Sequence, residues 1–196
     1  MKKNFDIIFY CDANKNTGFG HASRCAHISF ILHKYNANLK IGIIGDISKE
    51  PKKTMKNINN NIKFINYKNN VKSKIAFIDK MFNFEKPSYI EDSFIEKIKE
   101  ISDEIVLMFS GIKIQSIDKE ITYIGYHPIK NKYKDNNIKW GIQYAPTNIL
   151  KIKKISRNHN NILIALGGYK NNDEIKKLIL SINLIKEITT VDVLLS

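Results

Sequence analysis

The sequence has few cysteines, few arginines and no long hydrophobic run. Cys11 and Cys25 are its only cysteines in 196 residues, and neither their number nor their spacing predicts a disulfide framework or a metal site. No apolar run approaches the roughly 20 residues that a membrane span needs. Residues 1–9 show no signal-peptide pattern. We therefore expect a cytoplasmic protein with reduced, buried thiols, no metal, no cofactor and no membrane partner.

Lysine carries almost all of the positive charge. Only Arg24 and Arg157 are arginines among 32 basic residues, and the formal net charge is +13. The lysines occur in every segment beside abundant Asn and Ile, as an AT-rich genome would impose. This distribution predicts a solvated surface rather than a patch that binds nucleic acid. With 43% hydrophobic and 26% charged residues, the chain has the composition of a globular protein, which excludes general disorder.

Short apolar runs alternate with helical patterns over the first 145 residues. Residues 4–11 and 39–46 read as buried strands on either side of a helix at 21–34. Such a unit implies a parallel strand pair with a crossover. Another helix is expected at 89–102, and further short apolar runs or strands at 62–65, 75–78, 104–109, 121–125 and 138–144. The pattern predicts an α/β fold with a Rossmann-like, doubly wound parallel sheet.

A second α/β unit follows a lysine-rich connector. We expect a first domain at 1–145, a connector at 146–160 and the start of a second Rossmann-like domain at 161–196. The last segment reads as strand, glycine turn, helix and strand. About 36 residues cannot bury a core alone. Either they add strands to the first sheet, or the polypeptide is part of a two-domain protein whose other part is missing or separately encoded.

The loop between the first strand and the first helix contains the most informative residues. Open α/β sheets bind ligands at the carboxyl ends of their strands, and Gly18 and Gly20 allow the backbone to approach a ligand closely. His21 lies in the first helical turn, where the helix dipole favours the neutral imidazole that a general base needs. Arg24 lies on the same helical face and would grip an anionic substrate. Asp12 would orient His21 or pair with Arg24.

Each of these residues also has a purely structural interpretation. His21 would then only begin a helix, and Arg24 would only form a salt bridge with Asp12. Asp79 follows a strand, so it either reaches the ligand crevice or forms a turn. We expect His27 and His33, inside the helix, to be packing or surface residues.

Three ordered segments resemble one protein family. Residues 10–24, with Tyr10-Cys11-Asp12 and Gly18-Phe19-Gly20-His21, resemble the opening of the UDP-sugar hydrolases of pseudaminic acid biosynthesis and of the related spore coat polysaccharide biosynthesis proteins. Residues 140–145 are similar to the family's Gly-x-x-Tyr-Ala segment. Residues 162–168 are similar to the strand and double glycine that open its second domain.

The resemblance implies a GT-B-like architecture and a specific reaction. Family members hydrolyse a UDP-linked 2,4-diacetamido-2,4,6-trideoxy sugar (the β-L-altropyranose) by water attack at the anomeric carbon, without a metal. The implied general base is His21, and residues 161–196 would begin the nucleotide-binding domain. The implied substrate-binding residues are Asp12, Gly18, Phe19, Gly20, Arg24, Gly167 and Gly168. Two alternatives remain open: a glycosyltransferase-like protein, and a non-catalytic module that binds a sugar or a partner protein.

Overall fold

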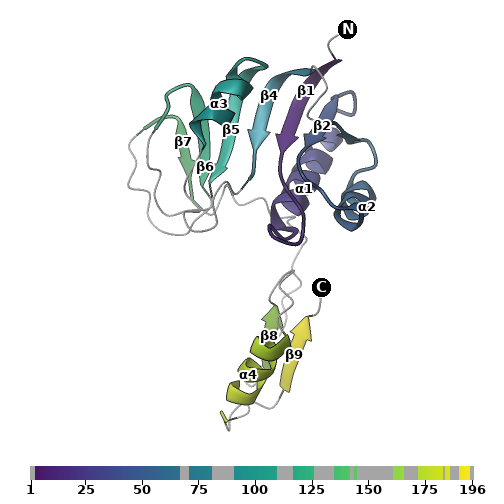
Figure 1. The fold of residues 1–196 in the computed structure, drawn as a ribbon, viewed down its shortest axis with the longest axis vertical. Helices are drawn as coiled ribbons and strands as arrows, with labels where there is room; N and C mark the ends of the chain where they lie inside the picture. Colours follow the sequence, from purple (N-terminus) through teal and green to yellow (C-terminus); the bar gives the residue numbers. More distant parts are fainter. Residues whose placement is uncertain are drawn as a thin grey trace. The chain divides into compact units, whose positions relative to one another are not determined.

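The computed structural model describes residues 3–66, 71–80, 91–109, 117–125, 135–141, 144, 161–165, 172–182, 184–185 and 190–194. The chain divides into two compact units, Met1–Asn148 and Ile149–Ser196. We describe each unit by itself (Figure 1).

The first unit is built on a seven-stranded sheet in which every strand pair is parallel. The strand order is β3-β2-β1-β4-β5-β6-β7. This confirms the Rossmann-like, doubly wound α/β expectation. The strands are β1 (Lys3–Tyr10), β2 (Ile41–Ile44), β3 (Lys63–Phe64), β4 (Val71–Ile78), β5 (Ser102–Phe109), β6 (Ile121–Gly125) and β7 (Ile138–Trp140).

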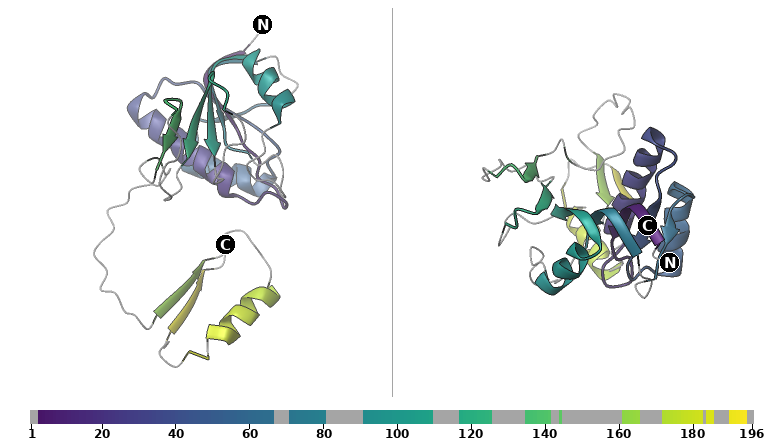
Figure 2. Two further views of the ribbon diagram at one scale, coloured as in Figure 1. Left: turned by 90° about the vertical axis from the view of Figure 1, so that its left-hand side faces the viewer. Right: turned by 90° about the horizontal axis from the view of Figure 1, so that it is seen from above.

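In the described part of this unit, three helices cover the two faces of the sheet. Helices α1 (Gly20–Tyr35) and α2 (Lys49–Ile58) lie on one face, and α3 (Asp92–Lys99) lies on the other (Figure 2). Helix α2 falls in a Lys/Asn-rich stretch in which sequence analysis expected no element. It has one buried residue, Met55, and Pro51 lies in its first turn, where a missing N–H costs little.

Two apolar clusters hold the helices to the sheet. Under α1 and α2, the side chains of Phe9, Ile43 and Met55 are fully or almost fully buried with Cys11 and Cys25. On the other face, the apolar residues of α3 belong to a second cluster with side chains of β1 and of β4 to β7. Each large buried aliphatic side chain contributes about 1.5–3 kcal/mol through burial. Burial on both faces explains the near-continuous apolar runs of β1 and β2.

The second unit contains β8 (Asn161–Ala165), α4 (Asn172–Ile182) and β9 (Thr190–Leu194). The two strands pair in parallel, so strand, helix and strand follow one another as the sequence predicted. No helix within the described ranges is long and apolar enough to cross a membrane.

Candidate functional site

The candidate site lies where the strand order of the sheet reverses. The chain runs from β1 to β2 and β3 on one side of β1 and then places β4 on the other side. Beyond the strands the backbone pairing continues, because the Asp79 N–H donates to the Tyr10 carbonyl at 2.9 Å and the Ala13 N–H donates to the Asp46 carbonyl at 2.9 Å. These bonds hold three strand ends side by side at the position where such sheets bind ligands.

Asp79 connects the end of β4 to the first turns of α1. Its Oδ1 lies 2.6 Å from Nδ1 of His21. The carboxylate also accepts two hydrogen bonds from Arg24, at 2.8 Å from Nε to Oδ2 and at 2.9 Å from Nη2 to Oδ1. The Asp79 side chain is 2% exposed, against 12% for His21 and 23% for Arg24. A nearly buried carboxylate thus positions two more accessible groups.

The short contact assigns the tautomer of His21. An ionised carboxylate only accepts hydrogen bonds, so a 2.6 Å approach to Asp79 places a proton on Nδ1. The Arg24 Nη2 atom, 2.9 Å from the same Nδ1, then directs its hydrogen to Asp79. In the neutral ring the acceptor is therefore Nε2, which makes no hydrogen bond to any residue that the structure describes. A carboxylate that fixes the tautomer of a histidine is the arrangement of a general base.

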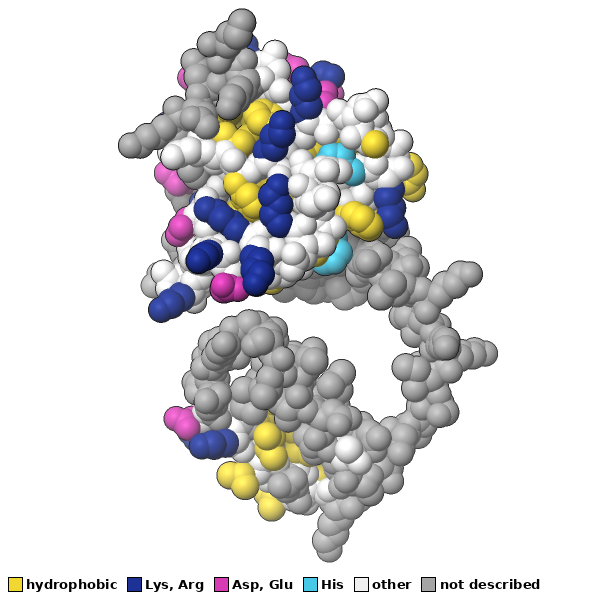
Figure 3. Space-filling model, turned by 90° about the vertical axis from the view of Figure 1, so that its right-hand side faces the viewer, with side chains coloured by type: hydrophobic (Ala, Val, Ile, Leu, Met, Phe, Trp, Pro, Cys, Tyr) yellow, Lys and Arg dark blue, Asp and Glu magenta, His cyan; other side chains and the backbone are white. Residues whose placement is uncertain are grey.

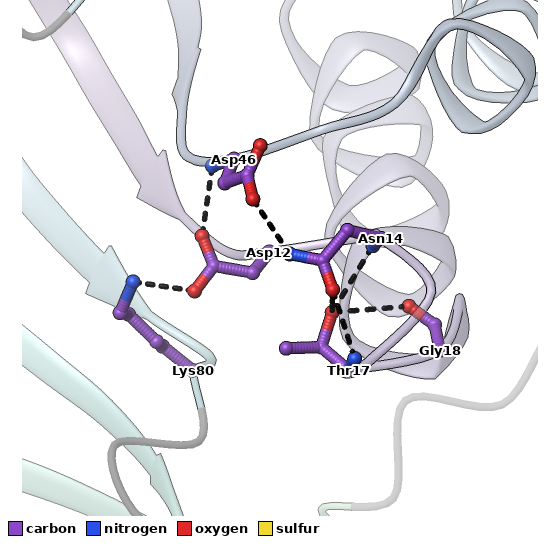
Figure 4. Close-up of polar contacts among 6 residues, drawn as sticks. All are labelled: Asp12, Asn14, Thr17, Gly18, Asp46 and Lys80. Carbon is purple, nitrogen blue, oxygen red and sulfur yellow. Dashed lines mark hydrogen bonds and ion pairs between the residues drawn. The ribbon is translucent and has the colours of Figure 1, made fainter.

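Asp12 has a different set of partners from the one that sequence analysis expected. Its Oδ2 forms an ion pair with Lys80, and its Oδ1 accepts the Asp46 backbone N–H at 2.8 Å (Figure 4). Gly45 allows this close packing, because a Cβ there would lie 1.7 Å from the Cys11 carbonyl oxygen. The carboxylate bonded to His21 and Arg24 is that of Asp79. Asp12 instead ties the ends of β1, β2 and β4 together.

The loop before α1 is closed on itself. Asn14 Oδ1 accepts a hydrogen bond from the backbone N–H of Thr17 at 3.0 Å (Figure 4). It also accepts one from the backbone N–H of Asn16 at 2.9 Å. Its Nδ2 donates to Asp46 Oδ2 at 2.7 Å. Gly18 has a φ of +69°, which a residue with a Cβ adopts only with strain. These contacts fix the path along which the chain enters α1.

The remaining predicted residues around this loop have unequal roles. Phe19 is half-buried and packs against the core under α1. Gly20 is exposed, and a Cβ there would meet Arg24 Nη1 at an ordinary 3.7 Å. No acidic residue and no side-chain cap neutralise the first turn of α1, so the positive end of its dipole faces this region. Gly167 and Gly168 lie outside the described residues.

Other groups that sequence analysis considered are structural. His27 Nδ1 lies 2.8 Å from the Ser23 carbonyl oxygen within α1. Cys11 and Cys25 are free and buried, and burial raises the pKa of the Cys25 thiol. Within the described parts of the chain, no three His, Cys, Asp or Glu side chains form a group that could hold a metal ion.

Sequence analysis named Asp79 without choosing it and did not consider Lys80. Asp79 had one usable signal, because it is the first polar residue after the apolar run 75–78, as Asp12 is after residues 5–11. Nothing in the sequence distinguishes Lys80 from the other lysines, because the chain contains thirty of them. Comparison of the chain with protein-family models, with curated proteins and with solved structures gave no significant match.

Proposed function

We propose that the chain acts in the hydrolysis of a nucleotide-linked sugar and that His21 activates the attacking water. The observation that carries the proposal is the pair formed by His21 Nδ1 and Asp79 Oδ1 at 2.6 Å. It sits at the reversal of the strand order, where ligands bind in sheets of this class. The resemblance of residues 10–24 to the pseudaminic acid UDP-sugar hydrolases supplies the substrate class.

In the proposed step, His21 Nε2 accepts a proton from water. The water oxygen forms a bond to the anomeric carbon, and the bond from that carbon to the oxygen of the β-phosphate breaks. The products are free sugar and UDP. Asp79 keeps the proton on Nδ1 and stabilises the imidazolium that forms. A positioned general base contributes about 10²–10⁴-fold to such a rate.

Arg24 contributes by positioning His21. Its guanidinium holds both oxygens of Asp79 through two hydrogen bonds, which prevents the carboxylate from rotating away from His21. A planar, two-pronged donor does this better than a lysine, which fits an arginine in a chain that otherwise uses lysine.

By the same resemblance, we infer a GT-B-like arrangement in which a second lobe binds the nucleotide. The succession β8, α4 and β9 in the second unit matches the way in which such a lobe begins. This part of the proposal rests on element order and on residues 162–168, and it gives no residue of the second unit a role in the chemical step.

The test is release of UDP from the UDP-linked 2,4-diacetamido-2,4,6-trideoxy sugar by the 196-residue chain. The assay uses high protein concentration, long incubation and chromatography of both products. We expect UDP and free sugar in equal amounts without an added acceptor. His21→Gln should lower the rate at least 100-fold. His27→Gln is the matched control on the same helix, because Nδ1 of His27 bonds to the Ser23 carbonyl oxygen of its own helix.

Two results would overturn the proposal. No release of UDP by the wild-type chain would favour a binding module. UDP release that depends on an acceptor hydroxyl would favour a glycosyltransferase-like reaction.

A further inference from the structure

Charge is unevenly distributed over the first unit. Residues 15–66, which contain α1, β2, α2 and β3, hold nine basic residues and only two acidic ones, Asp46 and Glu50. The described residues between 91 and 120, which contain α3 and β5, hold eight acidic residues and three basic ones. Helices α2 and α3 lie on opposite faces of the sheet. The described residues of the unit are therefore mainly basic on the side of α2 and mainly acidic on the side of α3.

The basic side of the unit presents a group of exposed lysines, which we call the basic face. Figure 3 shows Lys and Arg side chains gathered on the side of the molecule that α1 and α2 form. In α2, lysines recur at spacings of three and four residues, so they line one side of the helix. The basic face comprises Lys15, Lys34, Lys49, Lys52, Lys53, Lys56 and Lys63, all exposed.

The charges of the basic face are not neutralised within the described part of the chain. None of these lysines forms an ion pair with a described carboxylate. Lys34 lies over the Phe30 ring at 4.5 Å, and Lys52 lies over the Phe64 ring at 5.8 Å. Such contacts orient an ammonium group without cancelling its charge. On the acidic side, by contrast, Lys99 is surrounded by three carboxylates.

We propose that the basic face docks the protein onto an anionic lipid membrane surface. Lysine ammonium groups act as point charges toward lipid phosphates, and each one near such a surface strengthens binding. The first unit's one described arginine, Arg24, is bonded to Asp79, so the basic face lacks the forked donors that read nucleic acid bases. The acidic α3 side would be repelled, which gives the docked protein one orientation.

Side chains at the end of α1 add an interfacial contribution. Tyr35 is 87% exposed and Ile31 is 37% exposed, and both lie within one helical turn of Lys34. An amphipathic tyrosine ring favours the headgroup region of a bilayer. The sequence-based expectation of no membrane partner depended on the absence of a long apolar run and on lysines that occur in every segment. The basic face instead brings seven lysines of residues 15–63 to the side of α1 and α2.

The test is sedimentation of the 196-residue chain with phosphatidylcholine vesicles that contain either no phosphatidylglycerol or 30% of it. We expect binding only to the anionic vesicles, weaker at 150 mM than at 50 mM NaCl because salt screens surface charges. The triple variant Lys49→Gln, Lys52→Gln, Lys53→Gln should lower the partition coefficient at least tenfold. Circular dichroism checks that it is folded.

A matched triple variant distinguishes the effect of the basic face on vesicle binding from the effect of net charge alone. Lys72→Gln, Lys97→Gln and Lys119→Gln remove three exposed lysines outside the basic face and lower the net charge equally. We expect this variant to bind within twofold of wild type. Equal losses in both triples, no binding to the anionic vesicles at 50 mM NaCl, or tighter binding to a 30-base-pair DNA duplex would each overturn the proposal. So would self-association in light scattering that only the first triple abolishes.

Discussion

The two ends of helix α1 each hold a histidine, and the two side chains are bonded in different ways. At the amino end, His21 bonds through Nδ1 to Asp79 at 2.6 Å, and Nε2 bonds to no described residue. Near the carboxyl end, His33 uses both ring nitrogens. Its Nε2 lies 2.9 Å from the Leu39 carbonyl oxygen, and its Nδ1 lies 2.9 Å from Asn59 Nδ2.

The network around His33 is closed. Asn59 Nδ2 also donates to Ser29 Oγ at 2.9 Å, and Ser29 Oγ donates to the Ala26 carbonyl at 2.7 Å. Ser29 and Asn59 are buried. A fully satisfied buried network adds stability and specifies one packing, whereas His21 keeps a nitrogen with which to act on a ligand. The spare hydrogen-bonding capacity distinguishes the two histidines, although both belong to one helix.

The largest loss of stability is expected from Asp79→Ala, which removes the hydrogen-bond partner of His21. Arg24 would lose both of its hydrogen bonds to the carboxylate, and a partly buried cation would remain. Breaking such a pair destabilises a fold by about 3 kcal/mol. Urea denaturation measures this loss, and hydrolysis of the proposed substrate should also fall at least 100-fold.

Asp118→Ala is the control for Asp79, because Asp118 forms an ion pair with Lys99 in a more exposed position. Its removal should cost less than about 1 kcal/mol. The Lys99 ammonium and the Glu120 backbone N–H lower the pKa of Asp118. That stabilisation is therefore present at neutral pH and is lost as the pH falls below about 4. Equal losses of stability in the two variants would contradict the importance given to the buried pair.

A smaller loss of stability is expected when the network around His33 is broken. Asn59→Ala leaves the His33 ring and the Ser29 hydroxyl without their shared amide donor, which costs about 2 kcal/mol for buried polar groups. Hydrolysis per folded molecule should not change. A loss of hydrolysis at a temperature where the variant is fully folded would show that the two ends of α1 are not separate in function.

Much of the fold follows from local sequence patterns, whereas the partners in the site do not. The apolar runs predict most of the sheet, and strand 121–125 has the expected bounds. Helix α2 was missed because it buries one residue, and the first half of β4 was missed because exposed lysines alternate with its buried residues. Asp12 and Asp79 each follow an apolar strand. The choice between them as the partner of His21 depends on how α1 packs against β4, which no local pattern encodes.

Gly18→Ala tests whether the closed loop matters for the position of His21. The positive φ of Gly18 strains any residue with a Cβ by about 1 kcal/mol, although the space around a Cβ is open. We expect a small loss of stability and a measurable loss of hydrolysis, because the loop leads directly into α1. Gly20→Ala is the comparison, since its φ is not positive and its Cβ would make ordinary contacts. Identical behaviour of the two variants would mean that the loop conformation has no effect on the site.

The smallest effect on stability is expected for His21→Gln, which also removes the proposed base. Asp79 would keep its two hydrogen bonds from Arg24, so the carboxylate stays paired and the loss should be under about 1 kcal/mol. A group that contributes little to the fold but whose removal abolishes turnover has a role in chemistry rather than in packing. His33→Gln should show the opposite, with measurable destabilisation and unchanged turnover, because both ring nitrogens of His33 are used inside the protein. Thermal denaturation and UDP release, measured on both variants, give four values. If His21→Gln proves to be the more destabilising change, the pair of His21 and Asp79 has a structural role, and the distinction between the two ends of α1 fails.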